Sequence, residues 1–249
     1  MEMIKRGMEK RETPVKKYIL DRIGKISIFL LFVLAITGCL SRSKPAYIIE
    51  YFMFEYKCPA AGGLATLSEP IKVERFSVNK SFNTQAMVYK SYPFKFMTYN
   101  YSRWRVNPAD MVTDYLIRDM RNANIFANVF SHHNIENPRF IVEGHIQDFL
   151  EETDNKNIRA ILGANVSLLD TNRKDTSRRV VFQKQYNFQE QIGEHRPESF
   201  AKGMSTNMSR LSEELIKDIN KAIMNIASPV GPDQAGVNPE TSFRQGDRQ

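Results

Sequence analysis

Cysteine and tryptophan are scarce in this sequence, whose 249 residues contain two cysteines and one tryptophan. The cysteines are Cys39 and Cys58, and no histidine stands at the spacing from either that a zinc site uses. The adjacent His132 and His133 would point in different directions on any regular element, so the two imidazoles are poorly placed to bind one metal ion. We therefore expect neither a bound metal nor another cofactor.

The familiar catalytic motifs are also missing. The sequence has no G-x-S-x-G nucleophile elbow, no glycine-rich phosphate loop, no H-E-x-x-H zinc motif and no dinucleotide fingerprint. The carboxylates Glu151, Glu152 and Asp154 belong to a short charged segment, which predicts a solvated turn rather than a facing catalytic pair. These absences favour a binding or structural role over catalysis.

A long hydrophobic run is missing as well. The uninterrupted apolar segment Ile26–Ile36 has 11 residues. As a helix it would span roughly 16 Å, well short of the ~30 Å hydrocarbon core of a bilayer. Small residues follow this segment, and basic residues precede it, namely Lys16, Lys17, Arg22 and Lys25. This pattern predicts a cleaved secretory signal peptide.

The end of the apolar run is more specific. Residues Ile36-Thr37-Gly38-Cys39 resemble the lipobox of bacterial lipoproteins. The resemblance implies that Cys39 is acylated on sulfur, that the chain is cleaved before it, and that the new amino terminus is acylated too. Cys58 would then be the only remaining thiol, which excludes a disulfide within the chain. Two alternatives stay open: a plain signal peptide with an incidental cysteine, and a short membrane anchor.

The formal net charge of +7 is concentrated at the amino terminus. Residues 1–38 contain eight Lys/Arg and four Asp/Glu, so they carry +4 and the remainder carries +3. In the remainder basic and acidic residues alternate, and there is no long basic block. A basic segment ahead of an apolar run is better explained by membrane topology than by nucleic-acid binding. We expect no nucleic-acid partner.

Hydrophobic periodicity predicts the elements that follow. We expect strands over 47–56, 71–78 (with a bulge near Arg75), 140–150, 158–169 and 180–189, an extended segment over 125–130, and a hairpin of 87–90 with 94–101 around Tyr92-Pro93. Asn107 and Pro108 predict a helix that ends near 122–124. Apolar residues at every third or fourth position predict a second helix from Pro197 to about residue 226.

The order of these elements predicts the fold class and the division of the chain. Short charged links between the later strands indicate an antiparallel meander. We expect an α+β fold, a mainly antiparallel sheet with two long amphipathic helices packed on one face. The chain would comprise a lipoprotein signal peptide (1–38), a tether (39–46), one domain (47–227) and a tail (228–249). The tail is too polar to bury a core, so we expect it to be disordered.

An aromatic stripe follows the second arm of the predicted hairpin and comprises Phe94, Phe96, Tyr99, Tyr101 and Trp104. Packing in the core or across the strands would account for such a stripe. An exposed apolar face that meets a lipid or a partner would account for it as well. On the second interpretation, the candidate contact residues are Tyr99, Tyr101 and Trp104.

Several motifs in order carry a family resemblance. The lipobox is followed by the strand IKVERFSV, and then by a tyrosine-rich strand that leads through Trp104 and Pro108 into a helix. The motifs FIVEGHIQDF and ANVSLLD and a long helix complete the series. From about Cys39 to Ile226, the chain resembles the ABC-type transport auxiliary lipoprotein family.

The resemblance implies a non-enzymatic lipoprotein on the periplasmic side of the cell envelope, anchored in the membrane by its acyl chains. Its partners would be an Mce-domain protein and the ABC permease and ATPase of an Mce-, Mla- or Pqi-like phospholipid transport system. Only Cys39 carries over as a functional residue. Because Leu40 is not an aspartate, the enterobacterial sorting rule implies the outer membrane.

Three questions stay open at this point. The chain could assemble into a homo-oligomer. It could instead be an outer-membrane assembly lipoprotein that supports a β-barrel. It could also be an extracytoplasmic enzyme with an unrecognised site, which would require a polar pocket with convergent titratable groups.

Overall fold

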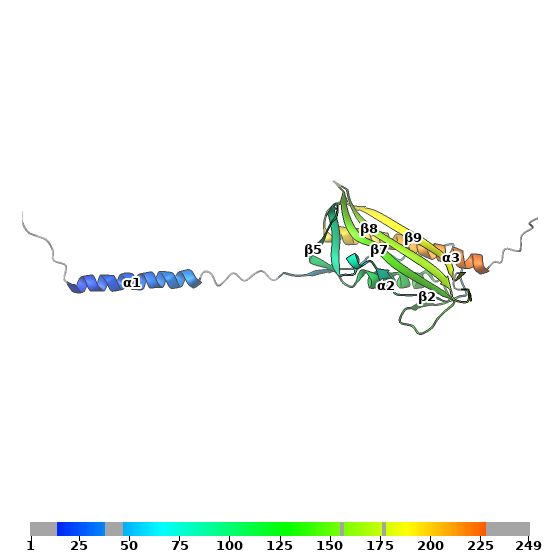
Figure 1. Cartoon of the computed structure of the whole chain (residues 1–249), viewed down its shortest axis with the longest axis horizontal. Coiled ribbons are helices and arrows are strands. Elements are labelled where there is room, and N and C mark those ends of the chain that lie inside the picture. The colour runs from blue at the N-terminus through cyan, green and yellow to red at the C-terminus, as the bar shows by residue number, and fades with distance from the viewer. Residues whose placement is uncertain (1–13, 38–46, 155–156, 176–177, 228–249) are drawn as a thin grey trace, which may run out of the picture. The chain divides into compact units, whose positions relative to one another are not determined.

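The computed structural model describes residues 14–37, 47–154, 157–175 and 178–227. The chain forms two compact units, Met1–Tyr47 and Ile48–Gln249. In the first unit, helix α1 extends over Pro14–Thr37 (Figure 1). Among the described residues, no helix is both long enough and apolar enough to cross a membrane. Cys39, the predicted tether over 39–46 and the predicted tail over 228–249 lie outside the described residues.

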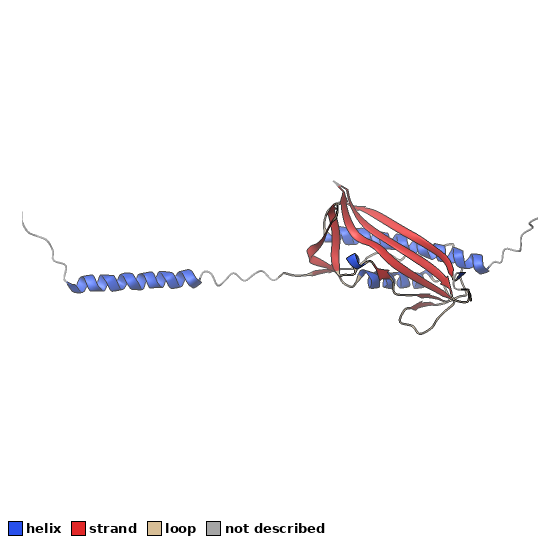
Figure 2. Cartoon of the chain, in the orientation of Figure 1, coloured by secondary structure: helices blue, strands red, loops and turns tan. Residues whose placement is uncertain are grey.

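The second unit combines a large sheet with two α-helices and one short 3-10 helix in its described part (Figure 2). The helices are η1 (Lys80–Phe82), α2 (Pro108–Ala123) and α3 (Pro197–Ala227). The strands are β1 (Glu50–Phe52), β2 (Ile71–Val73), β3 (Ser77–Val78), β4 (Ala86–Tyr92), β5 (Lys95–Trp104), β6 (Val129–Ser131), β7 (Phe140–Asp154), β8 (Asn157–Asp170) and β9 (Val180–Ile192). This confirms the predicted mixed α and β composition.

The sheet is mostly antiparallel. β7, β8 and β9 form a long antiparallel meander, and β4 and β5 form an antiparallel hairpin (Figure 1). The shorter strands pair in parallel, which the sequence pattern did not predict. β2, β3 and β4 pair in succession along one edge of β7, while β8 occupies the other edge. β1 pairs in parallel with β5, and β6 with β2.

Local signals explain both helices of this unit. The side chain of Asn107 accepts a hydrogen bond from the amide of Ala109, and Pro108 occupies the first turn. α2 ends at Ala123 and is capped by Asn124, which has the left-handed backbone conformation with φ of 52°. Both ends therefore confirm the predicted helix. In α3 the apolar stripe is buried as predicted, at Phe200, Met204, Met208, Leu211, Leu215, Ile219 and Ile223.

The helices pack closely on their neighbours. α3 packs against β8 and β9, and α2 packs against α3, β3 and β6. At Gly203 a methyl group would lie 2.8 Å from the Cβ of Ala160 and 2.7 Å from the Cγ2 of Ile192. Because real carbon atoms do not approach so closely, glycine is what allows α3 to lie this near the sheet.

The core is centred on an aromatic cluster around Trp104, which is fully buried. Its ring lies 6.0 Å from Phe54, 5.4 Å from Phe149 and 5.3 Å from Phe200 between ring centres, all in edge-to-face arrangements. The cluster thereby joins β5, β7, α3 and the segment that follows β1.

Two predicted strands and one predicted extended segment are shorter or interrupted in the structure. The range 47–56 contains only the short edge strand β1, and 125–130 contributes only the start of β6. The range 71–78 is interrupted between β2 and β3, where a bulge near Arg75 was predicted. At this interruption Phe76 turns into the core, and its amide donates a 3.0 Å hydrogen bond to Thr113 of α2.

Candidate functional site

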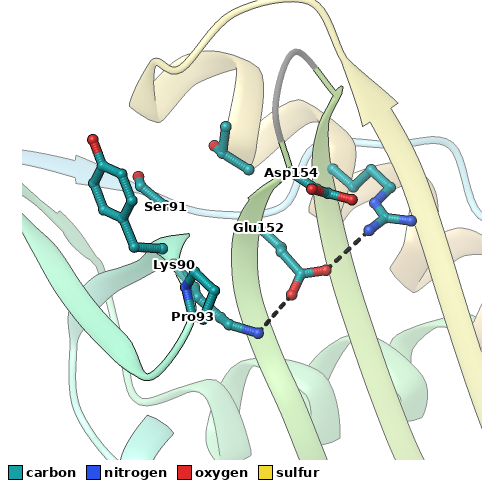
Figure 3. Close-up of a pocket in the computed structure, with 8 residues that line it drawn as sticks. Lys90, Ser91, Pro93, Glu152 and Asp154 are labelled. Atoms are coloured by element: carbon teal, nitrogen blue, oxygen red, sulfur yellow. Dashed lines mark hydrogen bonds and ion pairs between the residues drawn. The ribbon is translucent and has the colours of Figure 1, made fainter.

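A pocket opens where the tip of the β4–β5 hairpin meets the end of β7 and the start of β8 (Figure 3). Its volume is about 570 Å³, and its lining comprises Lys90, Ser91, Tyr92, Pro93, Glu152, Thr153, Asp154 and Arg159. Parallel pairing of β4 with β7 brings these elements together, since Lys90 pairs with Glu152 in the sheet. The pocket is therefore built from segments about 60 residues apart in the sequence.

Charges balance inside this pocket. The Nζ of Lys90 lies 2.9 Å from Glu152 Oε1, and the guanidinium of Arg159 lies 3.0 Å from Glu152 Oε2. The hydrogen bond from Lys90, aided by the positive charge of Arg159, lowers the pKa of Glu152. With both cations engaged by one carboxylate and Asp154 beside them, the pocket has no excess charge for a strongly charged ligand.

Glu151 points away from this pocket, because successive residues of a strand face opposite sides. It is fully buried, and the hydroxyl of Tyr99 donates a 2.8 Å hydrogen bond to its Oε2. The Nδ1 of His195 hydrogen-bonds its Oε1. Burial raises the pKa of Glu151, and these two hydrogen bonds oppose that rise. Burial and the nearby carboxylate also raise the pKa of Tyr99.

The prediction of a solvated turn at Glu151, Glu152 and Asp154 was wrong. β7 continues to Asp154 and pairs with β8 up to the last residue, so the charged segment is strand rather than turn. Successive residues of β7 face opposite sides of the sheet, so Glu151 is fully buried while its neighbour Glu152 is half-buried beside the pocket.

His195 was missed in the sequence, where it is one isolated histidine between a strand and a helix. Its ring stacks on Tyr99 with 5.0 Å between centres and lies edge-to-face on Tyr89 at 4.5 Å. The cluster of Tyr89, Tyr99, Glu151 and His195 thus joins β4, β5 and β7 to the segment before α3. The carboxylate of Glu151 in this cluster is fully buried.

The three aromatic residues proposed from the sequence do not form one surface. Tyr99 belongs to the cluster around Glu151, Tyr101 is 46% exposed, and Trp104 lies in the core. Trp104 consequently offers no surface to a partner in this structure. Three further solvent-exposed aromatic side chains of the hairpin lie nearer its tip, at Tyr92 (64% exposed), Phe94 (100%) and Phe96 (54%).

Among the described residues, no group of three or more His, Cys, Asp or Glu side chains could hold a metal ion. His132 and His133 have ring centres 3.9 Å apart. Cys58 is a free thiol that lies 2.9 Å from the side-chain amide nitrogen of Asn122.

Solved structures share this fold at low sequence identity. A Xanthomonas campestris protein of family DUF330 superimposes with a TM-score of 0.65 at 13% identity, covering 71% of this chain and 98% of that one. An uncharacterized protein superimposes with a TM-score of 0.54 at 10% identity, covering 69% and 99%. A search of curated proteins found no significant match. Residues 59–216 match the family described as the ABC-type transport auxiliary lipoprotein component.

Proposed function

Because this chain belongs to the ABC-type transport auxiliary lipoprotein family, we propose that it assists an ABC-type system that moves phospholipid between the membranes of the envelope. The proposed system is of the Mce, Mla or Pqi type. The family match over residues 59–216 carries the proposal. The family description names an auxiliary lipoprotein rather than an enzyme, so the proposed role is non-enzymatic.

The proposed anchor is Cys39. Acylation at this residue, after removal of residues 1–38, would hold the folded domain on the periplasmic side of the outer membrane through a tether of residues 39–46. The lipobox residues before Cys39 and the identity of Leu40 support this placement. One buried acyl chain binds only marginally, whereas several make the attachment stable.

The proposed partners are an Mce-domain protein and the ABC permease and ATPase. We further propose that α2 and α3 cover the same face of the sheet and leave the opposite face to a partner. The packing of α2 on α3 supports this arrangement. The polar side chains of Gln183, Gln185 and Asn187 on β9 are exposed and would belong to the uncovered face. Tyr101 remains a candidate contact on β5.

Affinity purification of the full chain from gently solubilised envelopes tests this function. We expect mass spectrometry to identify an Mce-domain protein together with a permease and an ATPase. The matched control is an untagged strain processed in the same way. Recovery of a β-barrel protein alone would contradict the proposal and indicate an assembly role, and recovery of no partner would also contradict it.

A further inference from the structure

The phenylalanine at the tip of the β4–β5 hairpin, Phe94, does not stabilise the fold. Tyr92 pairs with Lys95, so the loop consists of Pro93 and Phe94. Phe94 has a φ of 65° and is 100% exposed. A proline followed by a residue with positive φ is typical of the two central residues of a type II turn, the second of which is usually glycine. A phenylalanine there adds backbone strain and buries no apolar surface within the fold.

The hairpin carries only positive charge. The range Ala86–Trp104 contains Lys90, Lys95 and Arg103 but no aspartate or glutamate. Lys90 pairs with Glu152, and Arg103 donates to backbone carbonyls of its own strand. Lys95 is exposed and forms no ion pair with any residue that the structure describes. The tip therefore presents aromatic rings together with one available cation.

We propose that the hairpin tip, formed by Tyr92, Phe94, Lys95 and Phe96, inserts into the headgroup region of the bilayer that anchors the chain. Aromatic side chains favour the membrane–water interface, where the apolar acyl chains meet the hydrated headgroups. A lysine beside them is attracted to anionic headgroups. The inference rests on the lipid anchor of the proposed function and adds a second membrane contact to it.

The length of chain between the anchor and the hairpin permits both contacts at once. Cys39 precedes Glu50 by 11 residues, which can span up to ~38 Å when extended. Glu50 pairs with Ser102 on β5, and Lys95 is seven residues from Ser102, at most ~25 Å away. The tip is thus within reach of the membrane surface that holds Cys39. Ile48, which lies between Cys39 and Glu50 in the chain, is 81% exposed.

A tethered tip does not need high intrinsic affinity. The anchor keeps it near the membrane at high effective concentration, so a weak contact forms as an intramolecular step. Two points of attachment restrict rotation of the domain more than one anchor does. The tip would therefore set the orientation in which the domain meets its partners.

Depth-dependent fluorescence on the full chain, processed in cells and reconstituted into phosphatidylcholine and phosphatidylglycerol vesicles, tests the inference. Phe94→Trp and Tyr92→Trp place reporters at the tip. Gln183→Trp is the matched control, because Gln183 is exposed and lies far from the tip. Gln183 pairs with Ser167 of β8, and Ser167 is about 33 Å along the strand from Asn157, the first residue of β8, which lies at the hairpin end. Trp104 is buried and gives the same background in all variants.

We expect phospholipids brominated near the carbonyl end of their acyl chains, next to the headgroup region, to quench both tip reporters and to leave Gln183→Trp no more quenched than the unsubstituted chain. If the protein floats with the vesicles but neither tip reporter is quenched, the tip inference is wrong while the anchor stands. If the protein does not float with the vesicles, the anchor and the tip inference are both wrong. Protection of the tip reporters only after an Mce-domain protein is added would also overturn the inference and indicate a protein partner.

Discussion

The hydroxyl of Tyr99 donates a 2.8 Å hydrogen bond to Glu151, whose side chain is fully buried. The two residues lie on β5 and β7, strands that are not neighbours in the sheet, since β4 lies between them. The Nδ1 of His195, which is 44 residues after Glu151 in the chain, hydrogen-bonds the other carboxylate oxygen of Glu151. A buried carboxylate held by two hydrogen bonds links the hairpin to the start of α3, and it makes the stability of this region depend on pH.

Glu151→Gln should change that pH dependence. The pKa of Glu151 is raised above 4.5 in the folded chain, so the folded state binds more protons than the unfolded state just above this pH. Stability contributed by the protonated form is therefore lost as pH rises through the raised pKa. We expect the variant to gain stability relative to the unsubstituted chain as pH rises, with a slope of at most about 1.4 kcal/mol per pH unit.

Urea denaturation at a series of pH values from 4.5 to neutrality measures this difference. Glu143→Gln is the matched control, because Glu143 lies on the same strand but is exposed, and its profile should parallel that of the unsubstituted chain. Parallel profiles for Glu151→Gln as well would show that the buried carboxylate does not couple folding to pH.

Trp104→Ala should destabilise the domain by about 3–5 kcal/mol, because it removes the centre of a packed aromatic cluster. Trp104→Phe should cost much less, since the indole Nε1 forms no hydrogen bond to any described residue. Chemical denaturation measures both values. Partner capture per folded molecule should stay unchanged in Trp104→Phe, and a loss of capture would return Trp104 to the candidate contact surface.

Phe94→Gly should stabilise the domain by about 0.5–1 kcal/mol, because glycine adopts positive φ without the strain of a Cβ atom and the gain exceeds the added freedom of the unfolded chain. Phe94→Ala is the control, since alanine keeps the Cβ atom and should gain nothing. Thermal denaturation of the two variants checks the order. Equal stabilisation would mean that loss of the exposed ring, rather than relief of strain, is responsible.

Cys39→Ala should release the folded domain from the membrane. Each buried acyl methylene contributes about 0.8 kcal/mol to anchoring, so loss of the acylation site removes most of the membrane affinity. Fractionation after a salt wash should place the variant in the soluble periplasmic fraction. Cys58→Ala removes the only other thiol and should remain in the membrane pellet. Retention of Cys39→Ala in that pellet would argue for a different anchor.

Features with short-range causes were predictable from the sequence. Asn107 and Pro108 cap the start of α2 as predicted. The apolar stripe of α3 is also buried as predicted. Both features depend on residues close together in the sequence. The same holds for the β4–β5 hairpin and the β7–β8–β9 meander, where the loops are short and register follows from alternation.

Features that depend on distant segments were not predictable in this way. The burial of Glu151 follows from the parallel pairing of β4 with β7, and no local pattern in the charged segment indicates it. The role of His195 depends on the position of Tyr99, 96 residues earlier in the chain. The sequence indicated the break near Arg75, because apolar and polar residues stop alternating there. It did not indicate that Phe76 packs against Gly144.

The pairing of β2, β3 and β4 along a single edge of β7 has a consequence for how the chain reaches this fold. A ribosome produces residues 71–92 well before residues 140–154, so the early strands lack their partner strand until the later one has emerged. Non-local parallel pairing of this kind is slow. We expect the carboxyl-terminal meander to gain hydrogen-exchange protection first in pulse-labelling experiments, and β2 and β3 to dock on it afterwards. The part of the domain that is made first would then be the part that folds last.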